Sequence, residues 1–435
     1  MIGSLEQRWR NLGMAAGAVT AGLFAVFDLY QWALAYAGDR FHNDFTFYYA
    51  AARIGLAHGW PFIYDLHLQQ AELDAIGSGI KIAELARYIS PPPVAWSALP
   101  LTLLPYTAAY WTWSALLVIA LAVTWRLAAP GDGPWRLVHF AAAIGWLPVI
   151  YGLQLGQPGI FVALGVAACY ALLKADRPFW AGIALGALAL KPQLAFLVPA
   201  ALLLGGRTRA FWGSVAALGV LGVASAIALG PSGIAAYEAR LSFAAGVPVN
   251  RELTLAPLIG SLALTRLIQA AIALWALLLA YRLRGRGPEW IFIPALIGGL
   301  LASPYLHLDD LAMLGLAAWL YLRTSPRVWM PAFMLAVAVA IEGIPIWGPL
   351  PALAGELAAL VLVSVASLKH DAGGHSPWRP APSTRRRAPS PASPETSTSS
   401  PPRYSARAAS STFSDHWVST LRRSARSARC GSSAI

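Results

Sequence analysis

Apolar runs fill most of residues 1–369, and they constrain the fold of this chain more than any other feature. The runs are continuous rather than alternating, so they predict helices instead of strands. A helix needs roughly 20 apolar residues to cross the hydrocarbon core of a membrane. With 57% hydrophobic and only 12% charged residues, the chain is too apolar for a soluble protein of its size. We therefore expect an all-α polytopic membrane protein.

The length and spacing of the runs predict a transmembrane bundle of roughly 10 to 12 helices. Several runs have only about 12 to 16 residues, so we expect short, broken or re-entrant helices at Pro158, Pro192 and Pro304. Arg and Lys gather in alternate connections, which predicts a multi-pass protein of the plasma (inner) membrane with both termini in the cytoplasm. The runs lie at about 12–37, 94–104, 106–125, 137–152, 159–173, 179–190, 192–204, 210–229, 263–281, 290–302, 308–322, 328–343 and 351–368.

The longest polar interval of the apolar region, residues 38–93, follows the first run. We interpret it as a folded extracytoplasmic loop within a domain of residues 1–369. Its stretch from Asp44 to His58 predicts an amphipathic helix in the plane of the membrane interface. The first run is too long for a signal peptide, so we expect an uncleaved anchor.

Residues 370–435 are rich in Ser, Pro and Arg, and they predict a disordered cytoplasmic tail. This tail holds ten arginines and no lysine against three carboxylates, so it carries most of the net charge of +12. The charge therefore does not indicate nucleic-acid binding by the helical region. A solvated, functionally silent tail explains these arginines more simply than contact with anionic lipid headgroups.

Asp44 is the first candidate for catalysis, because it stands just after the first run and beside Phe45, Tyr48 and Tyr49. A carboxylate among aromatic rings at the interface can have a raised pKa and act as a general base. Asp44 is also suited to cap the helix that begins there. Taken from the residue alone, both interpretations stay open.

A polar octet, Ser303 to Asp310, separates two late apolar runs. Ionisable residues at membrane depth are costly and usually mark function. We expect His307 to bind a phosphate as a cation or to orient an acceptor hydroxyl. Asp309 and Asp310 are better explained by stabilisation of a helix N-terminus. A divalent metal held by Asp44, His307 and an aspartate is not excluded, but the spacing is not diagnostic and we predict no metal site.

Lys191 stands between two short runs and would face the same side as Asp44. Its ammonium suits a lipid phosphate, although snorkelling to the interface explains it equally well. Gln157 marks another break, where a buried amide and a substrate contact are both consistent with the sequence. Arg53 and Arg87 are further phosphate partners, with a solvated loop face as the default interpretation.

Six motifs occur in a fixed order along the chain. They are Asp44-Phe45 with Tyr48-Tyr49, Tyr64-Asp65, Ser90-Pro91-Pro92-Pro93, Leu155-Gly156-Gln157, Lys191-Pro192 and Ser303-Pro304-Tyr305 through Asp310. This set resembles glycosyltransferase family 87 of the membrane-embedded GT-C superfamily, which includes mycobacterial mannosyltransferases. The resemblance covers roughly residues 40 to 330.

The resemblance implies a GT-C-like bundle that takes a sugar, mannose or a related hexose or pentose, from a polyprenyl-phosphate donor. The sugar would pass with inversion to a lipid or glycan hydroxyl on the extracytoplasmic side. Asp44 matches the acidic residue of the family's first large loop and would act as the base; His307 matches a late-loop histidine. The implied partners are the donor, the acceptor and membrane lipids, with no nucleic acid and no cofactor beyond the donor. The substrate-binding residues would be Tyr48, Tyr49, Arg53, Gln157, Lys191, Tyr305 and Asp310.

A transporter or a flippase for lipid-linked glycans is the alternative from another functional class. Transporters tend to have repeated halves and substrate groups near the bilayer midplane. This sequence shows no evident internal repeat, and its polar groups gather at one face beside the 38–93 loop. That asymmetry favours the enzyme over the transporter. An inactive homologue that acts as an assembly factor is a third interpretation.

Overall fold

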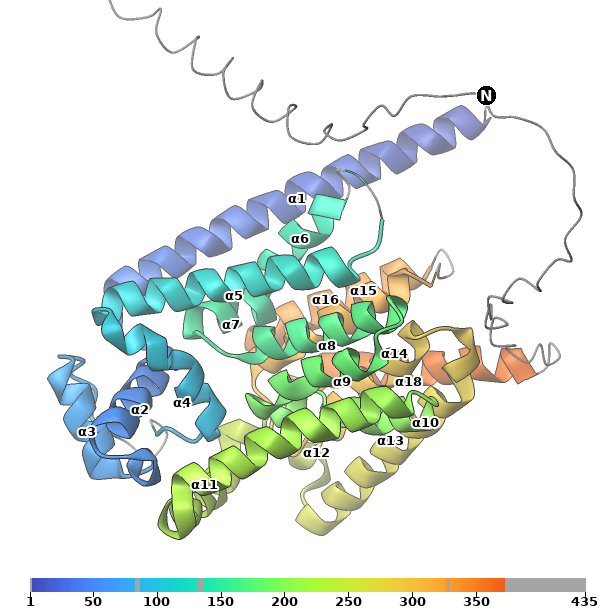
Figure 1. The fold of residues 1–435 in the computed structure, drawn as a ribbon. Coiled ribbons are helices and arrows are strands. Elements are labelled where there is room, and N and C mark those ends of the chain that lie inside the picture. Colours follow the sequence, from blue (N-terminus) through green and yellow to red (C-terminus); the bar gives the residue numbers. More distant parts are fainter. Residues whose placement is uncertain are drawn as a thin grey trace, which may run out of the picture. The chain divides into compact units, whose positions relative to one another are not determined.

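The computed structural model describes residues 2–82, 87–131, 133, 136–324, 326 and 329–371, with the backbone alone at 2–11, 14 and 369–371. Helices connected by short turns make up this part of the chain, and none of its residues lies in a strand (Figure 1). The predicted all-α fold class is confirmed. The predicted tail, 370–435, lies outside the described residues from position 372 onward.

Among the described residues, five helices are long and apolar enough to cross a membrane. They are α1 (Ile2–Gly38), α5 (Tyr106–Ala128), α11 (Thr208–Gly246), α13 (Leu262–Leu283) and α18 (Leu350–Asp371). The pair α6 (Arg136–Ile144) and α7 (Leu147–Leu155) is bent by 59° and passes the same test only when the two helices are taken together. The shorter apolar helices are α8 (Gly159–Lys174), α9 (Pro178–Ala184) with η4 (Leu185–Ala189), α14 (Glu289–Leu301) and α16 (Met330–Glu342). This mixture of long, short and bent helices is that of a polytopic membrane protein.

The predicted breaks lie where proline interrupts the helical hydrogen bonding. Pro158 precedes α8, Pro192 begins η5, and Pro304 lies in the non-helical stretch after α14. The remaining short elements are η5 (Pro192–Leu194), α10 (Leu197–Leu204), η6 (Pro248–Arg251), α12 (Ala256–Ile259), η7 (Arg284–Arg286), η8 (Leu308–Leu311), α15 (Ala312–Leu322) and α17 (Ile344–Trp347).

The segment between α1 and α5 folds into α2 (Phe45–Ala57), η1 (Trp60–Phe62), α3 (Leu66–Ala75), α4 (Pro92–Ala98) and η2 (Leu99–Leu103). Its predicted first helix is present, and its position relative to the membrane stays a prediction. Most of α2 is buried, and it is in contact with α3, α4 and η2. Its aromatic residues pack on α5, as when Phe45 meets Trp113 with ring centroids 5.4 Å apart. The loop therefore encloses the start of α2 instead of exposing it.

Helix α11 is longer than the sequence predicts. The apolar run predicted at 210–229 ends near residue 229, but helical structure resumes after it and continues to Gly246. Gly230 adopts φ 59°, which favours glycine, and Pro231 begins the second helical part, where it needs no hydrogen-bond donor. The kink carries Tyr237, Arg240 and Phe243 into the region of the polar loops.

Helix α14 forms the centre of the larger hydrophobic core, because every residue from Trp290 to Leu301 is buried. It packs against α10, α13, α15 and α18. Its neighbour α13 approaches closely at Gly298, where an added Cβ would lie 2.3 Å from the Cβ of Ala276. This packed helix fixes the starting point of the polar octet that follows it.

Candidate functional site

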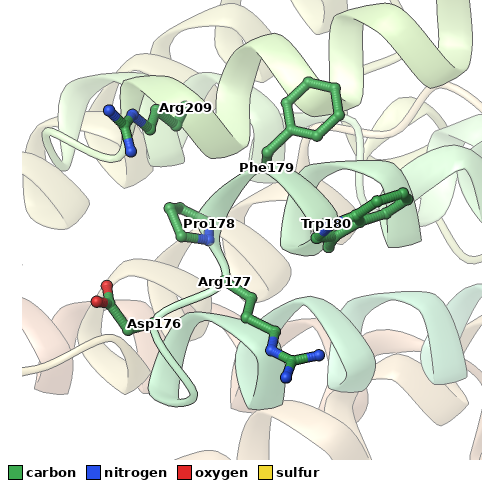
Figure 2. Close-up of a pocket in the computed structure, with 6 residues that line it drawn as sticks. All are labelled: Asp176, Arg177, Pro178, Phe179, Trp180 and Arg209. Atoms are coloured by element: carbon green, nitrogen blue, oxygen red, sulfur yellow. The ribbon is translucent and has the colours of Figure 1, made fainter.

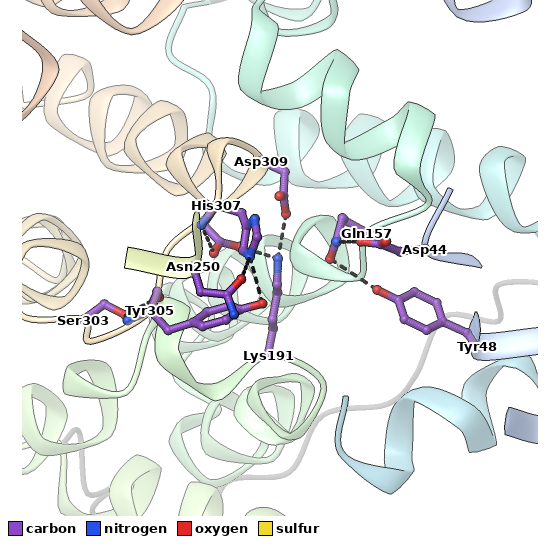
Figure 3. Close-up of polar contacts among 10 residues, drawn as sticks. Asp44, Tyr48, Gln157, Lys191, Asn250, Ser303, Tyr305, His307 and Asp309 are labelled. Carbon is purple, nitrogen blue, oxygen red and sulfur yellow. Dashed lines mark hydrogen bonds and ion pairs between the residues drawn. The ribbon is translucent and has the colours of Figure 1, made fainter. Parts of the chain in front are cut away.

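A cavity of about 560 Å³ lies where the large loop, the break after α7 and the late polar octet meet. Six of the nine predicted site residues line it: Asp44, Tyr48, Gln157, Lys191, Tyr305 and His307. Figure 3 shows their side chains directed toward one another from separate elements. The structure thus brings together groups from the loop, from two proline breaks and from the octet.

Asp44 occupies the N-cap position of α2, but its side chain makes no capping hydrogen bond. Asn43 takes that role instead, since its Oδ1 accepts from the backbone N–H of Thr46 at 3.1 Å. The Asp44 carboxylate accepts a hydrogen bond from the side-chain amide of Gln157 (Figure 3). Burial and, to a smaller extent, the nearby charge of Asp309 raise the pKa of Asp44 to about 6, against the lowering effects of Lys191 and Gln157. Of the two interpretations left open by the sequence, the contacts exclude simple capping.

Gln157 bridges Asp44 and Tyr48, whose hydroxyl donates to Oε1 of Gln157 at 3.3 Å. The preceding Gly156 ends α7 in the left-handed conformation, with φ 72°. An added Cβ at Gly156 would lie 2.8 Å from the Cβ of Phe45, so only glycine fits there without displacement. The Gly156-Gln157 break therefore lets α7 approach the start of α2 and places the amide against the Asp44 carboxylate.

Lys191 is buried and forms an ion pair at 2.6 Å with Asp309 Oδ2 (Figure 3). It forms a second ion pair with Asp310. Burial opposes the charge of Lys191, yet the two aspartates raise the pKa of its ammonium above the ordinary value. Asp310 additionally accepts from the backbone N–H of His307 at 2.9 Å. Lys191 does not snorkel to an interface, and its charge is already balanced inside the protein.

His307 lies with its Nε2 atom 2.8 Å from the hydroxyl of Tyr305 and 3.1 Å from Oδ1 of Asn250. The amide of Asn250 is itself held, because its Nδ2 donates to the backbone oxygen of Ala244 at 2.8 Å. Burial lowers the pKa of His307, so the ring is neutral at neutral pH. A neutral ring suits the predicted orientation of a hydroxyl.

Three predicted site residues do not line the cavity. Tyr49 donates from its hydroxyl to the backbone oxygen of Leu104 at 2.9 Å, and Arg53 pairs with Glu72 at 2.6 Å. These two contacts hold the large loop together. Asp310 is fully buried and reaches the site through Lys191 and His307.

The described carboxylates and imidazoles do not converge on a metal. Asp44 faces Gln157, both late aspartates face Lys191, and His307 faces neutral groups. Within the part of the chain that the structure describes, no group of three or more His, Cys, Asp or Glu could hold a metal ion.

Four further residues of the site were missed as functional candidates: Asn250, Arg251, Arg266 and Asp309. Arg251 and Arg266 line the cavity together with Asn250. The sequence offered a signal for Arg266, a single charge within the apolar run at 263–281, because isolated charges in such runs are costly and usually functional. It offered none for Asn250, whose role depends on the distant contact with His307.

A second cavity of about 300 Å³ lies between the turn after α8 and the start of α11 (Figure 2). Its lining is Asp176, Arg177, Pro178, Phe179, Trp180 and Arg209. None of the candidate site residues lies there. The chemistry singled out from the sequence therefore belongs to the larger cavity.

Residues 88–304 match the family model of glycosyltransferase family 87. No curated protein and no solved structure matches the chain. The matched segment includes Gln157, Lys191 and Asn250, whereas Asp44 and His307 fall on either side of it. The resemblance seen in the sequence is confirmed over this segment.

Proposed function

Residues 88–304 belong to glycosyltransferase family 87, and from this premise we propose which reaction this membrane glycosyltransferase performs. It takes a sugar, mannose or a related hexose or pentose, from a polyprenyl-phosphate donor. It passes the sugar to a lipid or glycan hydroxyl on the extracytoplasmic face, with inversion at the anomeric carbon. The proposal assigns the reaction to the cavity of about 560 Å³.

The placement of Asp44 carries the proposal. Its carboxylate lies on the cavity wall, held by Gln157, with a pKa raised by burial to about 6. A general base works best with a pKa near the working pH, where it is ionised yet still basic. Asp44 meets both conditions at neutral pH.

The transfer step requires one proton acceptor and one leaving group. The acceptor's hydroxyl oxygen attacks the anomeric carbon while its proton passes to the Asp44 carboxylate. The bond between the anomeric carbon and the phosphate oxygen breaks on the opposite face, and its electron pair leaves with the polyprenyl phosphate. One base is therefore sufficient, and no nucleotide is consumed.

Another part of the cavity wall consists of polar groups that carry no charge, in contrast to the Asp44 carboxylate. Tyr305, His307 and Asn250 present a hydroxyl, an imidazole and an amide. Such groups can donate and accept hydrogen bonds without a net charge, which suits the hydroxyls of a sugar. We assign this face to the orientation of the sugar.

The cavity also has an apolar portion, formed by Leu241, Phe243, Val247 and Val249. The side chains of Leu241 and Val249 are exposed, with exposed fractions of 45% and 42%. In a membrane protein such residues suit hydrocarbon chains. This wall supports a lipid-linked donor over a soluble one.

Transfer can be tested with the purified full chain, radiolabelled polyprenyl-phosphate mannose and a membrane lipid extract. We expect label to appear in a new lipid or glycan product, with the anomeric configuration inverted. The alternative, a transporter or flippase, predicts movement of the intact donor across the bilayer of proteoliposomes and no new product. That second result, or the absence of transfer from mannose and related sugar donors alike, would refute the proposal.

A further inference from the structure

Three of the four cations that the sequence nominated for a lipid phosphate have another partner or carry no charge. Lys191 is balanced by two carboxylates, His307 is neutral at neutral pH, and Arg53 is paired with Glu72. A phosphate leaving group nevertheless develops charge that fixed cations must stabilise. The remaining cationic side chains of the cavity therefore decide where the phosphate lies.

Three arginines line the same cavity: Arg87, Arg251 and Arg266. They come from three separate elements, namely the segment before α4, the end of η6 and the face of α13. None of the three forms an ion pair with a described residue. Asp44 is the one acidic side chain among the described residues of the cavity wall. The arginine side of the cavity thus has an uncompensated positive charge.

A fourth arginine lies close to this wall and strengthens the argument. Arg240 is within Coulombic range of Arg87, and the guanidinium of Arg87 lies 4.0 Å above the ring of Phe243. Nε of Arg87 and both Nε and Nη1 of Arg240 are buried without a hydrogen-bond partner in the described structure. Two adjacent like charges with unused donors are costly. A bound anion would accept those hydrogen bonds and remove the repulsion.

The arginines adjoin the apolar portion of the cavity. On α13, the cavity-lining residues Leu262, Thr265, Arg266 and Gln269 are spaced so that they share one helix face. Leu262 is 55% exposed, one turn before the charged group. The face therefore offers an apolar surface that leads to a cation, which is the pattern of a lipid with a phosphate at one end.

We propose that Arg87, Arg251 and Arg266, with Arg240 adjoining Arg87, bind the phosphate of the lipid-linked donor. This assignment depends on the proposed transferase function. Guanidinium groups present paired N–H donors that match phosphate oxygens, which a single ammonium does not. Lys191 is then a structural cation, and the arginines supply the charge that stabilises the departing phosphate.

The test measures binding separately from transfer. The full chain is placed in nanodiscs of phosphatidylcholine and titrated with a long-chain polyprenyl monophosphate that carries no sugar. Polyprenol of the same length, phosphatidylglycerol and inorganic phosphate serve as the other ligands. We expect the polyprenyl monophosphate to bind at least about tenfold more tightly than the polyprenol, because charge-assisted hydrogen bonds are strong.

The variants Arg87→Gln, Arg251→Gln and Arg266→Gln remove single guanidinium groups from separate elements. Each is expected to weaken binding of the polyprenyl monophosphate by about tenfold and to leave the affinity for polyprenol unchanged. Arg282→Gln, an exposed arginine on the same helix as Arg266 but outside the cavity lining, is the matched control and should bind like the native chain. Elution and unfolding temperature are compared for all four variants, so that a folding defect is recognised.

Equal binding of polyprenyl monophosphate and polyprenol would overturn the proposal. Native affinity for the polyprenyl monophosphate in all three cavity variants would overturn it as well. Displacement of the polyprenyl monophosphate by an equal concentration of phosphatidylglycerol would assign the arginines to phospholipid headgroups and also overturn it. The probe carries no sugar, so binding is measured independently of transfer. Arginine-dependent binding of the probe, with no transfer in the separate assay with polyprenyl-phosphate mannose, would refute the transferase function and leave the arginine site intact. If the native enzyme transfers sugar but its arginine variants bind the polyprenyl monophosphate normally, the transferase function stands and the arginine site is refuted.

Discussion

The side-chain amide of Gln157 donates a hydrogen bond to the carboxylate of Asp44, although 113 residues separate them in the sequence. The same amide accepts from the hydroxyl of Tyr48 at 3.3 Å. This contact joins the break after α7 to the start of α2. It holds the proposed base on the cavity wall and stabilises its ionised form.

The transfer rate should depend on pH through the state of Asp44. The raised pKa of about 6 means that Asp44 is protonated below that pH and cannot accept a proton. We therefore expect kcat/KM to fall as the pH is lowered through about 6 and to rise toward a plateau above it. The measurement is kcat/KM as a function of pH with a saturating acceptor.

Two substitutions should shift the acid limb of the pH profile, the fall of kcat/KM at low pH, in opposite directions. The hydrogen bond from Gln157 lowers the pKa of Asp44, so Gln157→Leu should shift the limb to higher pH. The charge of Asp309 raises that pKa, so Asp309→Asn should shift the limb to lower pH. Shifts in the same direction, or no shift in either variant, would show that another group controls the limb.

Lys191→Met should destabilise the fold strongly. It leaves Asp309 and Asp310 buried without a countercharge, and breaking a buried ion pair typically costs about 3–5 kcal/mol. Adding Asp309→Asn and Asp310→Asn to Lys191→Met should restore part of the loss. The exposed pair of Lys81 with Asp74 supplies the control, since Lys81→Met should cost about 0–1 kcal/mol. Denaturant unfolding in detergent measures all three, and equal losses for Lys191→Met and Lys81→Met would contradict the buried network.

The two cavities should open on opposite sides of the membrane. His67 lies on the loop that leads to the larger cavity, and Arg209 lines the smaller one; both are exposed. In a chain without Cys430, we expect a membrane-impermeant maleimide to label His67→Cys in intact cells. Arg209→Cys should be labelled only after the cells are permeabilised. Labelling of both in intact cells, or the reverse pattern, would disprove the proposed orientation.

Much of the fold could be predicted because hydrophobicity and proline act locally. Continuous apolar runs indicated helices, and the breaks at Pro158, Pro192 and Pro304 lie where proline removes a backbone donor. The extension of α11 beyond Gly230 was missed, because a Gly-Pro pair ends one helix and begins another with equal ease. The burial of α2 was missed because it depends on packing against α5, which local periodicity does not encode.

The candidate site was predictable where a residue is unusual for its position. Asp44, Gln157, Lys191 and His307 are polar groups at breaks in an apolar chain, and the structure places them around one cavity. Their partners were less accessible to sequence reasoning. Asp309 acts through Lys191 across 118 residues, and Asn250 acts through His307 across 57, so both contacts exist only after the chain has folded.

The most direct test of the account compares transfer by native protein, Asp44→Asn and Asp74→Asn. The asparagine at position 44 keeps the size of the side chain but cannot accept a proton, whereas Asp74 is an exposed carboxylate of the same loop outside the cavity. With polyprenyl-phosphate mannose as donor, we expect Asp44→Asn to lower kcat by about 10²–10⁴-fold and Asp74→Asn to retain the native rate. Native turnover by Asp44→Asn, with donor binding unchanged, would contradict the central claim that Asp44 is the base.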